Sequence, residues 1–188
     1  RWVSWVDNTD EDCQSTYHET INPLTSVCLS RCNRVSSHEH STKGKTTTTY
    51  MVKTILENTG HKVGLIGTIE ADTGSRTIPA ANTTPESYLV QKYFAEMVEN
   101  GCDSVVMEAS SQGCMLHRTA GFTFDYGIFT NIEPDHIGPN EHRDFEHYLE
   151  CKKMLLNQCR VGIVNRDDEH LAQILEGAGC QIETYGIG

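Results

Sequence analysis

The chain has 188 residues, of which 37% are hydrophobic and 22% charged, a size and composition that suit one packed domain with its own core. Its net charge of −11 argues against a nucleic-acid surface. No run approaches the roughly 20 apolar residues of a membrane span, and the polar residues near the start do not match a signal peptide. We therefore expect a cytoplasmic protein with neither nucleic-acid nor membrane partners.

The cysteines are dispersed among helix and strand patterns rather than set at the spacings of a disulfide framework. There are eight, at positions 13, 28, 32, 102, 114, 151, 159 and 180. Cys28 and Cys32 lack a second pair at zinc-ligand spacing, which makes a zinc–thiolate site a poor interpretation of that pair. We expect free, mostly buried thiols.

From residue 46 onward, helix-like and strand-like segments alternate. Apolar residues at helical spacing predict helices that end at Gly60 or span 85–99, 144–156 and 171–175. Short apolar runs predict strands at 63–66, 104–107, 126–129, 161–164 and 182–185. Repeated β-α-β order predicts a three-layer α/β fold with a mainly parallel sheet and helices on both faces.

Residues 1–42 do not join this alternation and are left unassigned. The stretch up to residue 20 is polar and acidic, and the following stretch mixes cysteine, arginine, serine and histidine without a clear period. No closing helix follows the last predicted strand, so we expect residues 43–188 to form part of a larger protein.

A phosphate-binding loop is indicated by Gly44-Lys45-Thr46-Thr47 at the start of a helix. In such a loop, backbone N–H groups hold phosphate oxygens, the lysine reaches the β- and γ-phosphates, and the threonine hydroxyl binds Mg²⁺. The preceding residues depart from the pattern, because Glu39 stands where a glycine is expected and the polar run 34–38 replaces a hydrophobic strand. The tetrapeptide alone fits nucleotide binding and an ordinary polar helix start about equally well.

Two neighbouring strands are followed by polar side chains. Glu108 ends one apolar strand, and Asn131 and His136 follow the next. Because ligands bind at the carboxyl ends of parallel strands, Glu108 is a candidate ligand of a hard cation. Taken singly, however, Glu108 also fits a solvated strand end, and His136 a hydrogen-bonded surface histidine.

Lys152 falls on the apolar stripe of the predicted helix 144–156, whereas Lys153 points elsewhere. A lysine on a buried face must extend its ammonium to solvent, pair with an acid, or lose its charge. One chemical alternative is a carbamate formed with CO₂, which inverts the charge and supplies oxygen ligands for a second Mg²⁺.

Together these motifs resemble the central ATP-binding domain of the Mur ligases, over about residues 43–188. The resemblance rests on several motifs in the same order. They are Gly44-Lys45-Thr46-Thr47, Asn82-Thr83-Thr84-Pro85-Glu86-Ser87, Met107-Glu108-Ala109-Ser110-Ser111-Gln112-Gly113, His117-Arg118, the run from Thr130 to His136, the run from Tyr148 to Lys152, and Asn165-Arg166-Asp167-Asp168.

The resemblance implies roles for individual residues. It implies that Gly44, Lys45, Thr46 and Thr47 bind ATP phosphates, that Asn131 lies against the adenine, and that Lys45, Glu108, His136 and Lys152 act in catalysis. It also implies one Mg²⁺ held by Thr46 and Glu108, and a second served by His136 and carbamylated Lys152. Thr83, Thr84, Ser110 and Arg118 would hold the UDP-sugar-peptide substrate, although a helix cap at Thr83-Thr84-Pro85 and a surface ion pair at Arg118 are the simpler structural readings.

The implied activity is ATP-dependent amide-bond formation in peptidoglycan precursor synthesis. ATP would activate the carboxylate of UDP-N-acetylmuramoyl-L-Ala-D-Glu as an acyl phosphate, which the amine of the third amino acid then attacks. The family's uridine-binding N-terminal domain and amino-acid-binding C-terminal domain do not fit in 188 residues, so we expect only the ATPase core here. Two alternatives stay open: a catalytically inactive nucleotide-fold protein, and a related ligase such as folylpolyglutamate synthase.

Overall fold

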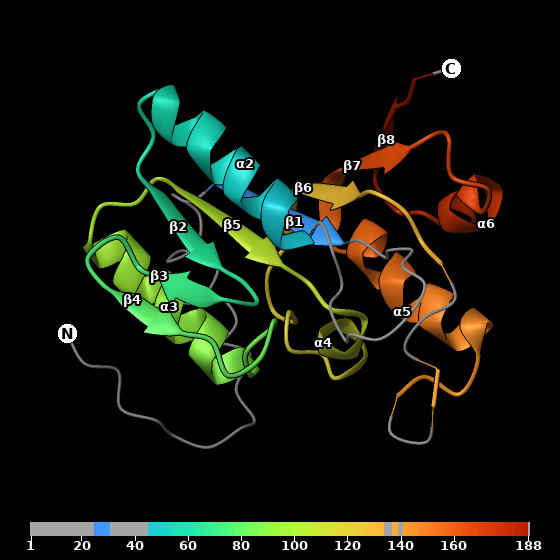
Figure 1. Cartoon of the computed structure of the whole chain (residues 1–188), viewed down its shortest axis with the longest axis horizontal. Helices are drawn as coiled ribbons and strands as arrows, with labels where there is room; N and C mark the ends of the chain where they lie inside the picture. Colours follow the sequence, from blue (N-terminus) through green and yellow to red (C-terminus); the bar gives the residue numbers. More distant parts are fainter. Residues whose placement is uncertain (1–24, 31–44, 134–136, 139–140, 188) are drawn as a thin grey trace.

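The computed structural model describes residues 25–30, 45–133, 137–138 and 141–187. They form one eight-stranded sheet in the order β4-β3-β2-β5-β1-β6-β7-β8, flanked by helices (Figure 1). The strands are β1 Thr25–Ser30, β2 Val63–Ile66, β3 Glu70–Asp72, β4 Thr77–Pro79, β5 Ser104–Glu108, β6 Phe124–Phe129, β7 Cys159–Asn165 and β8 Gln181–Tyr185. The helices are α2 Lys45–Asn58, α3 Ser87–Glu99, α4 Ser111–Met115, α5 Phe145–Asn157 and α6 Leu171–Leu175.

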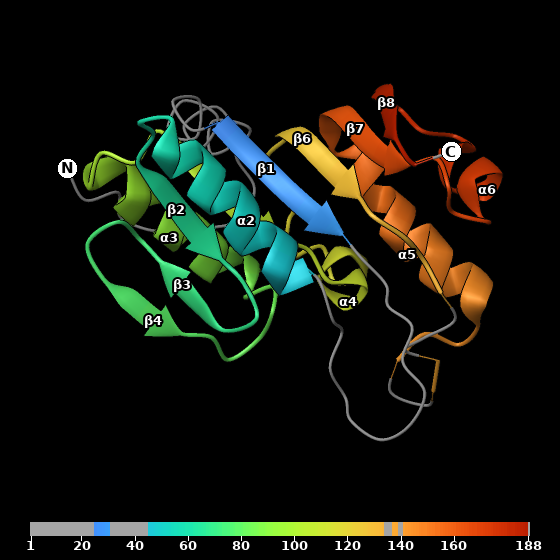
Figure 2. The same cartoon turned by 45° about the horizontal axis from the view of Figure 1, so that its top comes forward.

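Six strands, from β2 across to β8, pair in parallel, and β3 and β4 add an antiparallel margin. The predicted α/β fold with a mainly parallel sheet is therefore confirmed. Figure 2 shows β1, β2 and β6 pointing toward the same edge of the sheet, at which α2 begins and near which α4 lies. The parallel arrangement thus gathers the carboxyl ends of these strands at one edge.

Successive residues of each strand point to opposite faces of the sheet. Leu65 and Val106 pack with the half-buried Tyr50 and Leu56 of α2 on one face. This alternation is the period of two that a strand imposes on its side chains.

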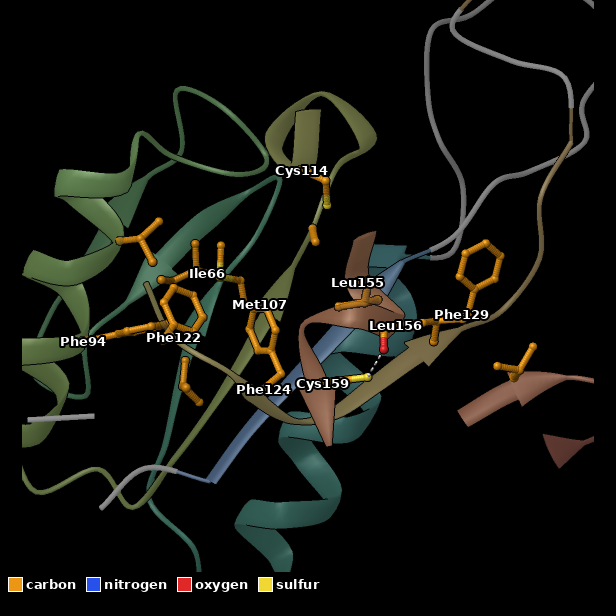
Figure 3. Packing of buried hydrophobic residues seen from close by; sticks show 14 of the residues in the cluster. Ile66, Phe94, Met107, Cys114, Phe122, Phe124, Phe129, Leu155, Leu156 and Cys159 are labelled. Carbon is orange, nitrogen blue, oxygen red and sulfur yellow. Dashed lines mark hydrogen bonds between the residues drawn. The ribbon is translucent and has the colours of Figure 1, made fainter. Parts of the chain in front are cut away.

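The opposite face carries the larger hydrophobic core, beneath α3 and α5. Phe122 lies between Phe94 of α3 and Phe124 of β6, with ring centroids 5.0 and 4.9 Å away in edge-to-face contact (Figure 3). Leu155 and Leu156 of α5 continue this core toward β7. Helices therefore cover both faces, as the sequence predicts.

One prediction is wrong: residues 1–42 do contain a strand of the sheet. β1 lies at its centre, where Val27 pairs with Val106 of β5 and with Tyr126 of β6. The polar run 34–38 occupies the place directly before the phosphate loop where a strand is expected, whereas β1 ends at Ser30 and fourteen residues separate it from α2. The prediction failed because we expected the strand to end directly before the phosphate loop.

Three short elements were also not predicted. The strands β3 and β4 have three residues each, too few to show a hydrophobic period. The five residues of α4, Ser-Gln-Gly-Cys-Met, carry no apolar residues at helical spacing. Among the described cysteines, positions 102, 114, 151, 159 and 180 are free thiols, as expected, and all but Cys180 are buried. None of the helices in the described part of the chain has the length and apolar character to cross a membrane.

Candidate active site

The first turn of α2 lies at the carboxyl edge of the sheet. Lys45, its first residue, is only 5% exposed, and Thr49 one turn later donates its hydroxyl to the Lys45 carbonyl at 2.7 Å. The first N–H groups of an α-helix point outward at its start, together with the positive end of the helix dipole, so a helix start favours anionic ligands. Of the predicted loop residues, Gly44 lies outside the described residues, while Lys45, Thr46 and Thr47 begin the helix as expected.

Glu108 faces this helix start from the end of β5, and it is fully buried. Its Oε2 accepts a hydrogen bond from Thr46 Oγ1 at 3.4 Å and one from Thr68 Oγ1 at 2.9 Å. The structure therefore brings together Thr46 and Glu108, the two residues predicted to share a cation. Two hydroxyls and one carboxylate form the oxygen-only donor set that Mg²⁺ prefers.

Thr68 was missed by the sequence analysis. Its backbone N–H donates to Glu108 Oε1 at 3.1 Å, and its hydroxyl also lies 3.1 Å from the Thr83 hydroxyl. Gly67 permits this close approach, because a Cβ there would stand 2.6 Å from Glu108 Oε1. The available signal was the pair Gly67-Thr68 directly after the predicted strand 63–66, at the same edge as Glu108.

The surroundings of Glu108 are acidic. Tyr50 of α2 donates its hydroxyl to Glu70 Oε1 at 2.7 Å. Burial, and then the hydrogen bond and charge of Glu70 together with the charge of Glu108, raise the pKa of Tyr50 well above its ordinary value. The carboxylates of Glu70 and Glu108 thus lie near each other at this edge, and they favour a bound cation.

Thr84 joins the Glu108 strand end to the next helix. It is fully buried, and its hydroxyl donates to the Glu108 carbonyl at 3.0 Å and accepts from the Ser110 N–H at 2.9 Å. Ser110 caps α4 by accepting the Gly113 N–H at 2.9 Å, and a Cβ on Gly113 would stand 2.6 Å from Thr84 Cβ. A substrate contact by these two residues stays a prediction; what the geometry shows is that they fix the loop after Glu108.

We expect Thr84→Val to lower the free energy of unfolding by about 2 kcal/mol, because the buried Glu108 carbonyl and the partly buried Ser110 N–H both lose their hydrogen-bond partner. Valine keeps the side-chain volume, so packing changes little. Urea denaturation measures the difference, and Thr77→Val, at an exposed position of β4, is the matched control. Equal effects of the two substitutions would contradict the role assigned to the Thr84 hydroxyl.

Arg118 reaches the same loop from the chain after α4. Its Nη1 donates to the Thr84 carbonyl at 3.1 Å, and its Nη2 lies 2.5 Å from Glu86 Oε1. Within the described residues, the buried Nε has no hydrogen-bond partner. The ion pair noted as the simpler reading is therefore present, but the side chain is mostly buried. Thr83 and Thr84 do not cap α3, whose N-cap is Glu86 without a side-chain cap bond.

On the other side of β1, Asn131 follows the end of β6. The adjacent Ile132 donates its N–H to Asp168 Oδ2 at 2.9 Å, and Asp168 Oδ1 accepts the His170 N–H at 2.8 Å. Asp168 of the turn after β7 thus holds the chain beside Asn131. A hydrogen bond therefore joins two of the predicted motifs, one after the end of β6 and one after the end of β7. His136 lies outside the described residues.

Lys152 is buried in α5, as its place on the apolar stripe predicts, and is 2% exposed. Its Nζ lies 5.3 Å from the centroid of the Tyr148 ring, one turn earlier in the helix. Burial raises the pKa of the nearby Cys114 thiol to about 11, and the charge of Lys152 opposes that rise. Lys153 instead pairs with the exposed Glu150 at 2.8 Å.

A family model described as the Mur ligase middle domain matches residues 42–188. The chain belongs to the Mur ligase family. Curated relatives in this family include the UDP-N-acetylmuramoyl-L-alanyl-D-glutamate–2,6-diaminopimelate ligase 1 of Clostridium acetobutylicum, which is 44% identical over 146 residues. The corresponding ligase of Chlamydia caviae is 43% identical over 149 residues. The matches cover 78% of this chain and 30% of each relative's length, so the chain spans under a third of these Mur ligases.

Solved structures with the same fold include other Mur ligases. A UDP-N-acetylmuramoyl-L-alanyl-D-glutamate–2,6-diaminopimelate ligase has a TM-score of 0.71 at 21% identity, over 92% of this chain and 34% of that one. Folylpolyglutamate synthase of Mycobacterium tuberculosis, solved as a complex with ADP, has a TM-score of 0.60 at 12% identity, over 91% of this chain and 44% of that one. At these identities the likeness establishes the fold alone.

Proposed function

We propose that this chain is the ATP-binding core of a ligase that adds the third amino acid to UDP-N-acetylmuramoyl-L-Ala-D-Glu. The observation that carries the proposal is the set of oxygens around buried Glu108. Thr46 at the start of α2 and Thr68 just after β2 both lie within hydrogen-bond distance of its carboxylate. The names of the curated relatives support 2,6-diaminopimelate as the amino acid added.

The residues at this edge suit Mg²⁺. Thr46 and Glu108 would hold one ion, and a second would be served by His136 and by Lys152 as its carbamate. The acidic surroundings of Glu108 favour a cation there, and Gly67 leaves room beside the carboxylate. Bound Mg²⁺ supplies positive charge that offsets the repulsion between ATP and the substrate carboxylate.

The chain's own groups bind and orient the reactants. The α2 N-terminus and Lys45 hold the β- and γ-phosphates, and Asn131 lies against the adenine. A carboxylate oxygen of the dipeptide attacks the γ-phosphorus and ADP leaves, which gives an acyl phosphate. The amine of the third amino acid then attacks the acyl carbon, releasing phosphate and a proton as the amide forms. Thr83, Thr84, Ser110 and Arg118 hold the UDP-sugar-peptide substrate, and Thr84 also fixes the loop after Glu108.

Calorimetry with Mg·ATP tests the proposal. We expect binding by the full chain and a loss of about 10- to 100-fold in affinity for Lys45→Ala, because hydrogen bonds to charged groups contribute about 1.5–3 kcal/mol. Lys53→Ala is the control, since it removes the same charge about two turns along the same helix. An absence of heat at millimolar Mg·ATP would instead identify the chain as a catalytically inactive member of the fold.

The Lys152 carbamate has its own test. Its formation joins the neutral Nζ to CO₂ and releases a proton, and we expect a carbamate signal in ¹³C NMR spectra of chain equilibrated with ¹³C-bicarbonate. The signal should disappear in Lys152→Arg and persist in Lys153→Arg, because the Lys153 ammonium is paired with Glu150. A spectrum that is the same in both variants would contradict carbamylation at Lys152.

A further inference from the structure

Three side chains that the proposed reaction does not use converge at the start of α5. One nitrogen each of His142 and His147 and the sulfur of Cys151 all lie within 4.8 Å of one another. We propose that these residues form a binding site for a thiophilic divalent cation of the Zn²⁺ class, separate from the oxygen ligands around Glu108.

Helix α5 positions two of the three ligands. Asp144 caps α5 by accepting the His147 N–H at 2.7 Å, which fixes His147 in the first turn. Cys151 follows four residues later, so both side chains lie on one face of the helix, one turn apart. This spacing is a common way for a helix to present two ligands to one metal ion.

The third ligand approaches from the loop before α5. His142 is buried, and its Nε2 lies 2.8 Å from Ser111 Oγ of α4. A metal would therefore be bound through Nδ1. Metal-binding histidines generally use their second ring nitrogen in a hydrogen bond of this kind, which fixes the orientation of the ring. The His142 and His147 ring centroids are 5.1 Å apart, at an angle of 66°.

The state of His147 is the observation that points to a ligand. Its Nδ1 is buried and, among the described residues, lacks a hydrogen-bond partner. Such orphaned atoms are uncommon, because leaving a buried polar group unsatisfied costs about 1–3 kcal/mol. The rest of the His147 side chain is partly exposed, whereas Cys151 is buried. A cation could therefore enter past His147 and satisfy the buried nitrogen.

The donor atoms select the class of metal. Two imidazoles and one thiolate suit Zn²⁺ and Co²⁺, whereas Mg²⁺ requires oxygen ligands. Bonds of about 2.0–2.3 Å to one ion bring ligand atoms to about 3.5 Å of one another, so small side-chain rotations would close the present spacing. A water or an external ligand would complete the tetrahedron.

Cobalt spectroscopy on the full, reduced chain tests this site. We expect one equivalent of Co²⁺ to give a thiolate-to-cobalt charge-transfer band and the intense d–d bands of tetrahedral cobalt, and Zn²⁺ to abolish both. Removing only the hydrogen-bond partner of a metal ligand weakens metal binding about 10- to 100-fold. Cys151→Ala removes a ligand itself, so we expect it to lower the cobalt affinity by more than this and to abolish the charge-transfer band. His147→Gln, at a partly exposed position, should weaken binding and keep the fold, as circular dichroism will show.

Matched thiol variants separate this site from the others in the chain. Cys114→Ala removes another buried thiol, and a Cys28→Ser, Cys32→Ser double variant removes the closely spaced pair. Both should retain the charge-transfer band and the stoichiometry. A band that survives in Cys151→Ala, or that disappears in the double variant, would overturn the proposal, as would cobalt binding without any thiolate band.

Discussion

Glu108→Gln is expected to lower the affinity for Mg·ATP by more than about 100-fold. Removing one partner from a buried pair of opposite charges costs about 3–5 kcal/mol, and each 1.4 kcal/mol is tenfold in affinity. Glutamine keeps the shape of the side chain but supplies a neutral oxygen, and its NH₂ would replace an oxygen that now accepts a hydrogen bond from Thr46 or Thr68. The loss should therefore concern the metal complex more than free ATP.

Titrations with and without Mg²⁺ measure this effect. Wild-type chain should bind Mg·ATP more tightly than ATP in EDTA, and Glu108→Gln should bind the two about equally. Glu57→Gln is the matched control, since it makes the same change at an exposed position near the other end of α2. Retention of the Mg²⁺ effect in Glu108→Gln would show that Glu108 is not a ligand of the metal.

Phe124→Ala is expected to lower the free energy of unfolding by about 3–5 kcal/mol, a large part of the stability of a small domain. Phe124 is fully buried in β6 and packs edge-to-face on Phe122, which in turn packs on Phe94 of α3 (Figure 3). Truncation would leave a cavity between a strand and a helix that cannot easily close.

Tyr126→Ala provides the comparison for Phe124→Ala. It lies two residues later in the same strand and is 42% exposed, so its truncation should cost less than about 1 kcal/mol. Urea denaturation of both variants gives the difference. If the two costs were similar, the buried three-ring cluster would contribute no more to stability than an exposed ring of the same strand.

The longer elements could be predicted because their side chains are sorted by burial. In α5, the buried Tyr148, Leu149, Leu155 and Leu156 recur at helical spacing, and the helix starts at Phe145 beside the predicted first residue. The strand over Val63–Ile66 is buried throughout and was predicted without error. Apolar residues at helical spacing, or in a short continuous run, are therefore enough to predict a helix or a buried strand from the sequence alone.

β1 shows why the rest could not be predicted. Its sequence, Thr-Ser-Val-Cys-Leu-Ser, is a strand because two other strands flank it, and both of those strands come much later in the chain. Local residue preferences do not contain that information.

Part of the candidate site could be predicted from sequence motifs. Thr46 belongs to the phosphate-loop motif and Glu108 ends a predicted strand, and the structure brings the two side chains together. Thr68 was missed because its part in the site depends on the hairpin of β3 and β4 that begins just after it, and elements of three residues leave no readable period. His136 and Gly44 stay predictions, since both lie outside the described residues.

The position of β1 also affects how the protein is made. Val27 pairs with Val106 and Tyr126, so the central strand β1 is synthesised well before both of its neighbours, β5 and β6. At about 5–20 residues per second, several seconds pass before either neighbour exists. During that interval the nascent chain carries a strand with two open edges, which can pair with other chains. We therefore expect the yield of folded protein to depend on translation speed and chaperone supply as well as on the stability of the finished sheet.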